Sequence, residues 1–359
     1  MTWNTPHDTI RLLYTIMQCV ASVVLGKVRK WGQAFMKVLG IDIGGTKSGV
    51  LLAETSGANV TFIDKRTFAT DHVGGSMAMI EKFAAEAADL LRVNSLTTAD
   101  VSAAGINCGG PLDSRRGMIL CPPNLPGWVN IPVVDLLTEK LGIRCFLQND
   151  ANAGALAEFL FGAGRGCQNL MFLTFGTGMG AGLVLNGRLY AGTNDMAGEV
   201  GHIRMAPFGP VGFGKAGSFE GFCSGGGLAQ LARTKALERL QMGSSTMYCE
   251  TLAALDGVTA QTVAEAARAG DETALSVFAV CGAQLGAALS LFIDILNPEK
   301  ILIGSIYGKC EDLLADAVRA VIQREAIPFA SAVCSVEPCG LGDQINDYEA
   351  VAIAVDGLR

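Results

Sequence analysis

The chain has 359 residues, with 27 basic and 34 acidic side chains, which gives a formal net charge of −7 and a pI near 5.1. Half of the residues are hydrophobic and 17% are charged, a composition that excludes disorder over most of the length and supports a large buried core. The acidic balance excludes a broad electrostatic attraction to phosphate backbones, so no nucleic-acid partner is expected.

Residues 1–35 differ in composition from the rest of the chain. Residues 12–26 are mostly apolar, and a short basic segment follows them. One interpretation is a signal peptide or a membrane anchor, but the run is shorter than the ~20 residues that span a bilayer, and no cleavage site follows a basic start. The other interpretation is a surface helix. We therefore expect an extension outside the core and no membrane span.

Two segments are each predicted to form a strand, a glycine-rich turn and a second strand. Residues 171–186 align without a gap to residues 39–54, with residues of similar character at matching positions. This indicates an internal duplication whose copies face one cleft. Glycines let backbone N–H groups approach an anion, so two facing turns are predicted to hold two parts of one polyphosphate. Either turn alone is also compatible with an ordinary hairpin.

A short strand at residues 144–148 is predicted to lead into Asn149 and Asp150, which open a helical stretch. An aspartate at this place is most simply a helix cap. It is also suited to act as a general base, because phosphoryl transfer needs one carboxylate to accept the proton of the attacking hydroxyl. From the residues alone both interpretations stay open.

Three further polar residues stand in glycine-rich segments, Glu199 and His202 in one and Glu220 in another. Carboxylate and imidazole groups suit sugar hydroxyls, and they also suit a metal. A purely structural histidine is the alternative for His202. Asn124 lies in a proline-rich loop, where its amide either contacts a ligand or caps the turn.

The rest of the chain is predicted to be mostly scaffold. Residues 272–297 form a long apolar helix, ended by Pro298, that belongs to the core or to an oligomer face. A strand at 300–304 precedes a turn that closes over a nucleotide base and a helix from about residue 311. A last helix over residues 346–359 is expected to pack back on the first half.

Five motifs in order, LGIDIGGTK, NDANA, LTFGTGMGAGLV, GEVGH and GSFEGFCSGG, resemble the ROK family of sugar kinases and regulators over about residues 36–355. The resemblance implies an α/β protein with the actin-like (ribonuclease H-like) ATPase fold, two α/β domains around a cleft. It implies a small domain over 36–148, a larger one over 149–345, and a C-terminal helix over 346–359 that returns to the small domain.

The resemblance also implies roles for individual residues. Asp150 matches the catalytic base, and Asp42 is expected to orient Mg²⁺ through water. The residues implied to bind the nucleotide are Asp42, Gly44, Gly45, Thr46, Lys47, Gly176, Thr177, Gly178, Gly180 and Gly304. Those implied to bind the sugar are Gly110, Asn124, Asn149, Asp150, Glu199, His202 and Glu220.

The sequence departs from the family pattern in two places. Val211, Phe213 and Ser218 occupy the positions of three zinc-binding cysteines, and a closed zinc site needs four donors, so no zinc is expected. Packing of Phe208, Phe213, Phe219 and Phe222 is expected to hold this loop instead. Second, Gly304-Ser-Ile-Tyr stands where kinases of the family carry a glycine triplet, which is expected to alter nucleotide binding.

The sequence therefore predicts a cytoplasmic, ATP-dependent and Mg²⁺-dependent kinase for the 6-hydroxyl of a hexose, with glucose as the first choice. Eleven cysteines without a Cys-x-x-Cys spacing favour that reducing compartment. Kinases of N-acetylmannosamine, N-acetylglucosamine, fructose or allose are alternatives within enzymes. A sugar-sensing regulator without a DNA-binding head is the alternative outside them. A homodimer is expected because dimers are common in the family.

Overall fold

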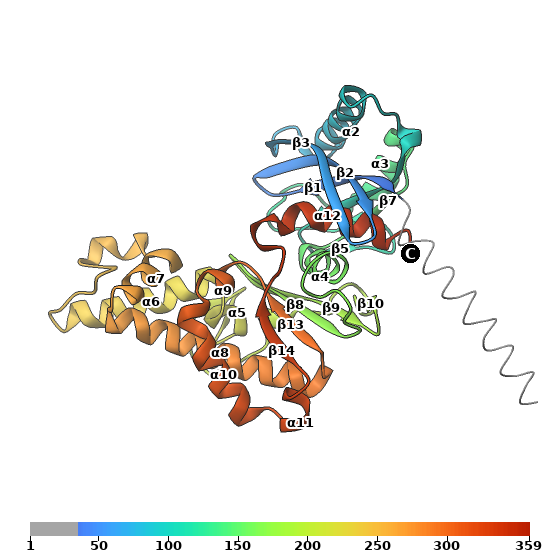
Figure 1. Cartoon of the computed structure of the whole chain (residues 1–359). Helices are drawn as coiled ribbons and strands as arrows, with labels where there is room; N and C mark the ends of the chain where they lie inside the picture. Colours follow the sequence, from blue (N-terminus) through green and yellow to red (C-terminus); the bar gives the residue numbers. More distant parts are fainter. Residues whose placement is uncertain (1–34) are drawn as a thin grey trace, which may run out of the picture.

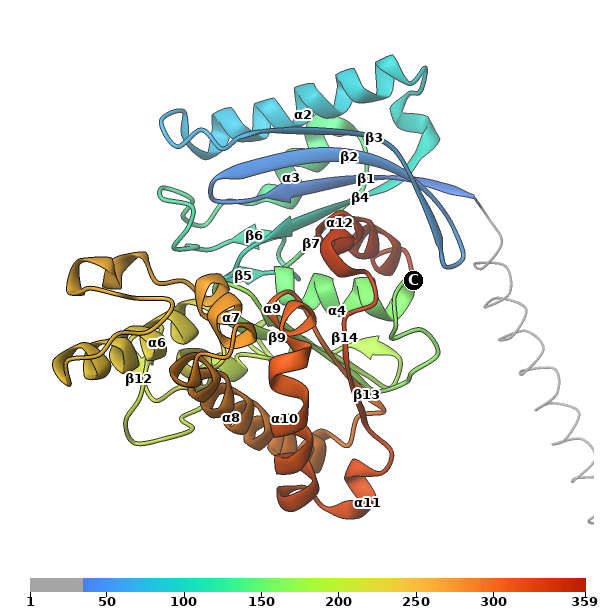
Figure 2. The same cartoon turned by 60° about the vertical axis from the view of Figure 1, so that its left-hand side comes forward.

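The computed structural model describes residues 35–359, so the extension expected before them lies outside the described part of the chain. Within that part, two five-stranded sheets lie one above the other, with helices α4 (Asp150–Leu160) and α12 (Ile345–Asp356) packed against each other between them (Figures 1 and 2). The remaining long helices cover the outer faces of the two sheets (Figure 2).

The first sheet has the strand order β3-β2-β1-β4-β7. Strands β1 to β3 form an antiparallel meander, and β4 and β7 continue the sheet parallel to β1. The bounds are β1 Met36–Ile43, β2 Lys47–Ser56, β3 Asn59–Ala69, β4 Val101–Cys108 and β7 Cys145–Gln148. Helices α2 (Gly75–Val93) and α3 (Val133–Leu141) cover one face and α12 covers the other (Figure 2).

Strand β1 is apolar on both faces because both faces are covered. Leu39 and Ile41 pack in the core with α2, whereas Val38 packs in the core with α12. Glycines bring α12 especially close to the sheet. A Cβ on Gly105 would lie 2.0 Å from the Ala350 carbonyl oxygen, and one on Gly40 would lie 2.8 Å from the Ala350 Cβ.

The second sheet has the order β10-β9-β8-β13-β14, with β9 antiparallel and β13 parallel to β8. The bounds are β8 Leu170–Phe175, β9 Met179–Leu185, β10 Arg188–Leu189, β13 Lys300–Ile303 and β14 Ser335–Pro338. Alternate residues of β8 separate its two faces, since Phe172 packs near Ala155 of α4 while Leu173 packs on the other side. That other side carries α6 Gly225–Gln241, α7 Ala260–Arg268, α8 Glu272–Leu296 and α10 Glu311–Glu325.

Short elements complete the described chain. They are β5 Leu112–Asp113, β6 Met118–Ile119, β11 Val211–Gly212, β12 Lys215–Ala216, α5 Phe219–Phe222, α9 Ile306–Lys309 and α11 Pro328–Ser331, with 3₁₀ turns η1 Thr98–Asp100, η2 Val200–His202, η3 Leu252–Gly257 and η4 Gly342–Gln344.

Both predicted glycine hairpins are present, as β1-β2 and β8-β9, but their gapless overlay is wrong at the turn. Ile43 pairs with Ser48, whereas Phe175 pairs with Met179, so the second connection is one residue shorter than the first. The register of a hairpin depends on cross-strand pairing, which residue type alone does not determine.

The predicted apolar helix is α8, which ends at Asn297 in the left-handed conformation just before Pro298. It is the one helix within residues 35–359 that is long and apolar enough to cross a membrane by length and composition. In the fold, 61% of the most apolar 18-residue stretch of α8 is buried, and the helix packs along α10 and α6.

Candidate active site

Two adjoining pockets meet at the second glycine turn. The inner pocket, of about 410 Å³, is lined among others by Gly110, Asn149, Asp150, Glu199 and Glu220. The outer pocket, of about 850 Å³, is lined by residues of α6, α7 and the β13-α9 turn. Gly176 and Thr177 line both pockets, so a ligand that occupied both would pass over this turn.

Asn149, not Asp150, is the residue that caps helix α4. The Asn149 Oδ1 atom accepts a hydrogen bond from the Asn152 backbone N–H at 2.8 Å, which makes Asn149 the N-cap of α4. Gln148 supports this turn, since its Oε1 atom accepts from the Asn149 backbone N–H and from the Asn152 side-chain amide. Asp150 therefore is not needed as the cap, and its side chain lines the inner pocket.

The Asp150 side chain is exposed to the space of the inner pocket and lies within its concave walls. Burial raises the pKa of Asp150 above its ordinary value, and the hydrogen bond that it accepts from the Ala151 backbone N–H opposes the shift. Asp42, at the end of β1, is affected in the same way. Burial, together with the charges of Asp347 and Asp150, raises the Asp42 pKa to about 6, while Lys65 and Asn107 act to lower it.

Glu220 lies against the second glycine turn. Its Oε2 atom accepts a hydrogen bond from the Met179 backbone N–H at 3.1 Å. A Cβ on Gly178 would lie 2.8 Å from this oxygen, so a side chain at that position would displace the carboxylate. The Thr174 Oγ1 atom accepts from the Gly180 N–H at 2.8 Å and so fixes the second half of the turn.

The expected sugar residues are only partly brought together. Glu199, which precedes the η2 turn, lines the inner pocket, but His202 at the end of that turn does not. The imidazole of His202 packs edge-on against the ring of Phe213, with centroids 5.1 Å apart. Lys215 holds the segment from the other side, since its Nζ donates to the His202 carbonyl oxygen at 2.6 Å.

Asn124 and the first glycine turn lie side by side, but neither lines the inner or the outer pocket. A Cβ on Gly45 would lie 2.7 Å from the Asn124 carbonyl oxygen, and one on Gly109 would lie 3.4 Å from the Asn124 Nδ2 atom. Asn124 therefore sits between the first turn and the Gly109-Gly110 segment that reaches the inner pocket. The first turn is anchored by the Thr70 Oγ1 atom, which donates to the Gly44 carbonyl oxygen at 2.6 Å.

The expected aromatic packing of the loop after His202 is wrong for two of its four residues. Phe219 and Phe222 are buried, but Phe208 and Phe213 are 87% and 76% exposed. Backbone hydrogen bonds hold the loop instead, because the Gly217 carbonyl oxygen accepts from the Met205 and Ala206 N–H groups. Phe213 contacts the His202 ring but otherwise faces solvent.

The three positions expected to lack zinc ligands carry no metal-binding chemistry. Val211 is in the β11-β12 hairpin, and the exposed Phe213 is in its turn. Ser218 is fully buried and caps α5, since its Oγ atom accepts from the Gly221 N–H at 3.1 Å. Residues 35–359 contain no group of three or more histidine, cysteine, aspartate or glutamate side chains arranged to hold a metal ion.

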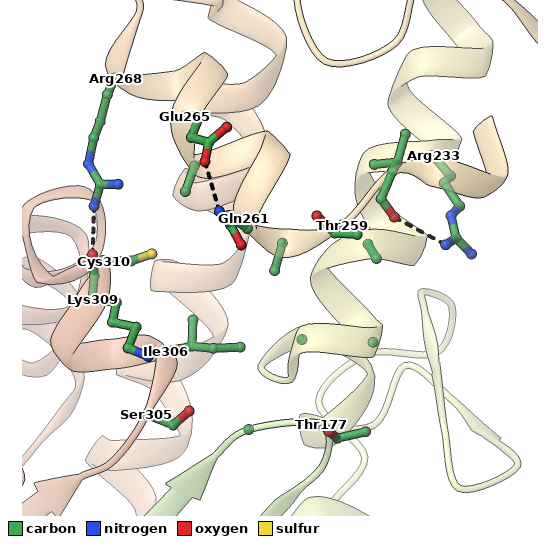
Figure 3. Close-up of a pocket in the computed structure, with 17 residues that line it drawn as sticks. Thr177, Arg233, Thr259, Gln261, Glu265, Arg268, Ser305, Ile306, Lys309 and Cys310 are labelled. Carbon is green, nitrogen blue, oxygen red and sulfur yellow. Dashed lines mark hydrogen bonds between the residues drawn. The ribbon is translucent and has the colours of Figure 1, made fainter. Parts of the chain in front are cut away.

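The outer pocket, shown in Figure 3, was largely missed by sequence reasoning. Only the glycine turn and the residues after β13 had been singled out, and Gly304 itself does not line the pocket, whereas Ser305 and Ile306 do. The side chains contributed by α6, α7 and α9 include Arg233, Gln261, Glu265, Arg268 and Lys309. None belongs to a motif. The one available signal was Ser224 before three glycines, which is typical of a capped helix start that lets a ligand approach closely.

The start of α6 is tied directly to the second glycine turn. The Gly225 N–H donates to the Gly176 carbonyl oxygen at 2.8 Å, and a Cβ on Gly225 would lie 3.1 Å from Ile306 Cδ1. The glycine turn, the N-terminus of α6 and the β13-α9 turn therefore form one continuous wall of the outer pocket.

Comparison with known proteins places these features in a family. The sequence profile of the ROK family matches residues 38–355. A glucokinase from Halalkalibacterium halodurans is 35% identical over 294 residues, which cover 81% of this chain and 86% of that protein. The DNA-binding transcriptional dual regulator NagC of Escherichia coli is 30% identical over 218 residues, but these cover 61% of this chain and 52% of the regulator.

Solved structures agree with this placement. The crystal structure of a ROK family glucokinase from Streptomyces griseus in complex with glucose and AMPPNP is 27% identical, with a TM-score of 0.66 over 89% of this chain and 99% of that one. A ROK hexokinase from Thermus thermophilus is 27% identical with a TM-score of 0.71, over 90% and 99% of the two chains. The expected fold class, actin-like with two α/β layers around a cleft, is confirmed.

Proposed function

The chain belongs to the ROK family, and on this premise we propose that it is an ATP-dependent glucokinase that transfers a phosphoryl group to the 6-hydroxyl of glucose. One observation carries the proposal more than any other. Asp150 lines the inner pocket, which shares Gly176 and Thr177 with the larger outer pocket, so a carboxylate lies in a sugar-sized space that adjoins a nucleotide-sized one.

In this proposal Asp150 is the catalytic residue. Its carboxylate accepts the proton of the 6-hydroxyl as the oxygen attacks the terminal phosphorus of ATP, and the bond between that phosphorus and the bridging oxygen breaks to release ADP. Because the surrounding pocket raises the pKa of Asp150 above its ordinary value, the group is a stronger base than an ordinary aspartate. Asn149 keeps it in place by capping α4.

The remaining inner-pocket residues are proposed to bind the sugar hydroxyls. Carboxylates such as Glu199 and Glu220 accept hydrogen bonds from neighbouring sugar hydroxyls. A sugar epimer whose hydroxyl points the other way would leave these carboxylates without a donor and would therefore bind less tightly. Asn149 and Gly110 line the same space. His202 and Asn124 lie behind it, and we propose that they reach the sugar when the two halves of the molecule close.

We propose that ATP lies over the second glycine turn, with its base in the outer pocket. The N–H groups of Thr177 and Gly178 and the positive N-terminus of α6 are suited to phosphate oxygens. Gly176 and Gly180, whose N–H groups donate within the turn, are proposed to let the nucleotide approach the backbone closely. Ser305, next to Gly304, lies on the adenosine side. The first turn, with Gly44, Gly45, Thr46 and Lys47, is proposed to hold the terminal phosphate on closure.

The site also fits Mg²⁺. Burial and, to a smaller extent, the charges of Asp347 and Asp150 raise the pKa of Asp42, and a bound cation would stabilise its carboxylate. When bound, the ion would neutralise charge on the phosphate oxygens. Asp42 would hold it, directly or through water. We propose no zinc in the His202 loop, because Val211, Phe213 and Ser218 offer no thiolate.

Asp150→Asn tests the proposal. The asparagine keeps the shape of the side chain but cannot accept the proton, so glucose-dependent ADP release from Mg·ATP should fall on the order of 10³-fold. Glucose binding, followed by calorimetry, should stay close to that of the wild type. Asp135→Asn, exposed on α3, is the matched control and should keep full activity. Near-normal turnover of Asp150→Asn would refute the assignment.

A panel of sugars decides between the alternatives. Glucose, fructose, allose, N-acetylglucosamine and N-acetylmannosamine should be compared by kcat/KM, and preference for an N-acetylhexosamine or for fructose or allose would replace glucose in the proposal. The resemblance to the regulator NagC keeps a second candidate, a sugar-binding regulator. Sugar binding without any ADP release across the panel would favour it.

Three further features complete the proposal. Two domains are proposed to close on the sugar: the part before residue 149 together with the returning C-terminal helix, and the part from 149 to 345.

A cytoplasmic location is proposed, in keeping with ten free thiols between residues 35 and 359. A homodimer is proposed through the exposed apolar side chains of Ile295, Ile327 and Phe329 near the end of α8.

A further inference from the structure

Four carboxyl groups gather where α12 crosses the ends of β1 and β4. Asp42 ends β1, Asp150 opens α4, and Asp347 and Glu349 lie on α12. The charge of Asp347 acts to raise the pKa of Asp42, and the charges of Asp150 and Asp42 act to raise the pKa of Glu349. The proposed chemistry uses Asp42 and Asp150, but it gives no role to Glu349, which is the most buried of the four at 6% exposure.

The position of Glu349 is fixed by the close packing of α12. The next residue, Ala350, sits over Gly40 and Gly105, where there is no room for a Cβ. The helix therefore cannot shift to bring Glu349 to solvent without opening the first sheet. A carboxyl group that is held in such a place must find its partners inside the protein.

Glu349 has one such partner, Asn107 of β4, which is 5% exposed. The Asn107 Nδ2 atom donates to the Glu349 Oε2 atom at 2.8 Å. Asn107 is also the register neighbour of Asp42 across the parallel β1-β4 pair, and its side chain lowers the pKa of Asp42 by hydrogen bonding. Asn107 thus connects the buried glutamate to a carboxylate of the proposed site.

The Asn107 amide is left with an unpaired acceptor. Its Oδ1 atom is buried and accepts no hydrogen bond from any residue of the described chain. An ionised Glu349 offers only acceptors, so it cannot satisfy this oxygen. A protonated Glu349 has one O–H to donate, and an acid facing an amide can form two hydrogen bonds, one in each direction.

We propose that Glu349 is a positioning residue, held as the neutral carboxylic acid, whose O–H donates to the Asn107 Oδ1 atom and thereby fixes the Asn107 amide beside Asp42. This inference rests on the proposed kinase function. A neutral acid can donate a hydrogen bond at the base of the site. It also avoids a third negative charge next to Asp42 and Asp150, where the phosphates of ATP are proposed to lie.

The charged groups around Glu349 support the neutral form. Burial raises the pKa of Glu349 well above its ordinary value, and the charges of Asp150 on α4 and Asp42 on β1 raise it further. Asp347 on the same helix acts in the same direction. Lys65 of β3, a cation on a neighbouring strand, forms its ion pair with Asp347 rather than with Glu349. The thiol of Cys108 on β4 is uncharged, because burial and the same two aspartates raise its pKa.

Two variants of the full-length protein separate this role from simple packing. In Glu349→Gln the amide reproduces both hydrogen bonds of the neutral acid, so kcat with glucose and Mg·ATP should stay within about twofold of wild type. In Glu349→Leu the volume is kept but the Asn107 amide loses its partner, so kcat should fall about tenfold or more while the KM for glucose changes little. Glu250→Gln, on the exposed surface, is the control.

An infrared difference spectrum of wild type minus Glu349→Gln at pH 7 provides a readout that packing alone would not give. The C=O stretching band of a protonated carboxylic acid should appear as a positive band, and the difference for the Glu250→Gln control should show carboxylate bands instead. This measurement remains decisive even if Glu349→Leu fails to fold.

Three results would overturn the inference: a glutamine variant as slow as the leucine variant, a leucine variant as fast as wild type, or a carboxylate band for Glu349. A wild-type protein that binds glucose but does not phosphorylate it would instead refute the kinase proposal, and the infrared band would still report the protonation of Glu349.

Discussion

At the scale of single residues, two neighbouring side chains of the site have different roles. Asn149 caps α4, and this leaves the adjacent Asp150 carboxylate directed at the inner pocket. The sequence shows both residues but not the division, since either side chain is a suitable cap. The role of Asp150 as general base stays a prediction until Asp150→Asn is assayed.

Asp42 is expected to reduce stability at neutral pH. Its pKa of about 6 is raised above the model-compound value of 3.8, so the folded protein binds a proton more tightly than the unfolded chain does. Ionising Asp42 in the folded state lowers the free energy of unfolding. This loss of stability is absent below about pH 4, grows as the pH rises from 4 to 6, and is complete above pH 6, where it is at most about 3 kcal/mol.

Asp42→Asn should therefore raise the free energy of unfolding at pH 8, measured by urea denaturation without nucleotide or Mg²⁺, and should remove part of the loss of stability between pH 4 and 6. Kinase activity should fall in the same variant. Asp113→Asn, at the end of a short strand outside this carboxyl cluster, is the comparison. Equal pH profiles of stability for Asp42→Asn and wild type would contradict the assigned pKa.

At the scale of elements, what the sequence could predict was local. The glycine hairpins and the long apolar helix α8 were predicted correctly, because alternation, turn residues and a following proline lie within each segment. The one-residue difference between the two turns depends on pairing between strands. The outer-pocket side chains come from α6 and α7, and Asn107 meets Glu349 across 242 positions, so only the folded chain brings them together.

The close packing of α12 on the first sheet leads to a second prediction. Gly105→Ala would place a methyl group 2.0 Å from the Ala350 carbonyl oxygen and 2.7 Å from the Ala354 nitrogen, and both belong to a backbone that cannot yield without moving the helix. We expect a loss of about 3 kcal/mol or more of stability, at or above the usual cost of overpacking. Gly257→Ala, where a Cβ meets nothing within 4 Å, is the control in the same thermal unfolding experiment.

At the scale of the whole molecule, a hydrogen-bonded contact joins the two halves beside the inner pocket. Asp195, in the loop after β10, is buried, and its carboxylate accepts from the Ser114 N–H at 2.7 Å and from the Ser114 Oγ at 2.8 Å. Arg115 adds a bond to the Gly192 carbonyl oxygen. This contact connects the β5-β6 turn that follows Gly110 to the loop that leads to Glu199.

Ser114→Ala should weaken this contact. The buried carboxylate of Asp195 loses one of its two donors, which should cost about 1–3 kcal/mol of stability. We expect a larger radius of gyration by small-angle X-ray scattering without sugar and a higher KM for glucose, with little change in kcat. Ser102→Ala, exposed on β4, should behave like wild type. An unchanged radius and KM would show that the contact does not control closure.

The return of α12 to the first sheet has a consequence for synthesis on the ribosome. The face of β1 and β4 that carries Gly40 and Gly105 stays uncovered after β7 has emerged, until the chain as far as Ile345 has been made. At about 5 to 20 residues per second this interval lasts about 10 to 40 s. The first half of the protein is thus translated early but completed last. A nascent chain stalled before Ile345 should stay sensitive to protease and bind chaperones, whereas the whole chain, stalled on a C-terminal linker long enough to release α12 from the ribosome, should not.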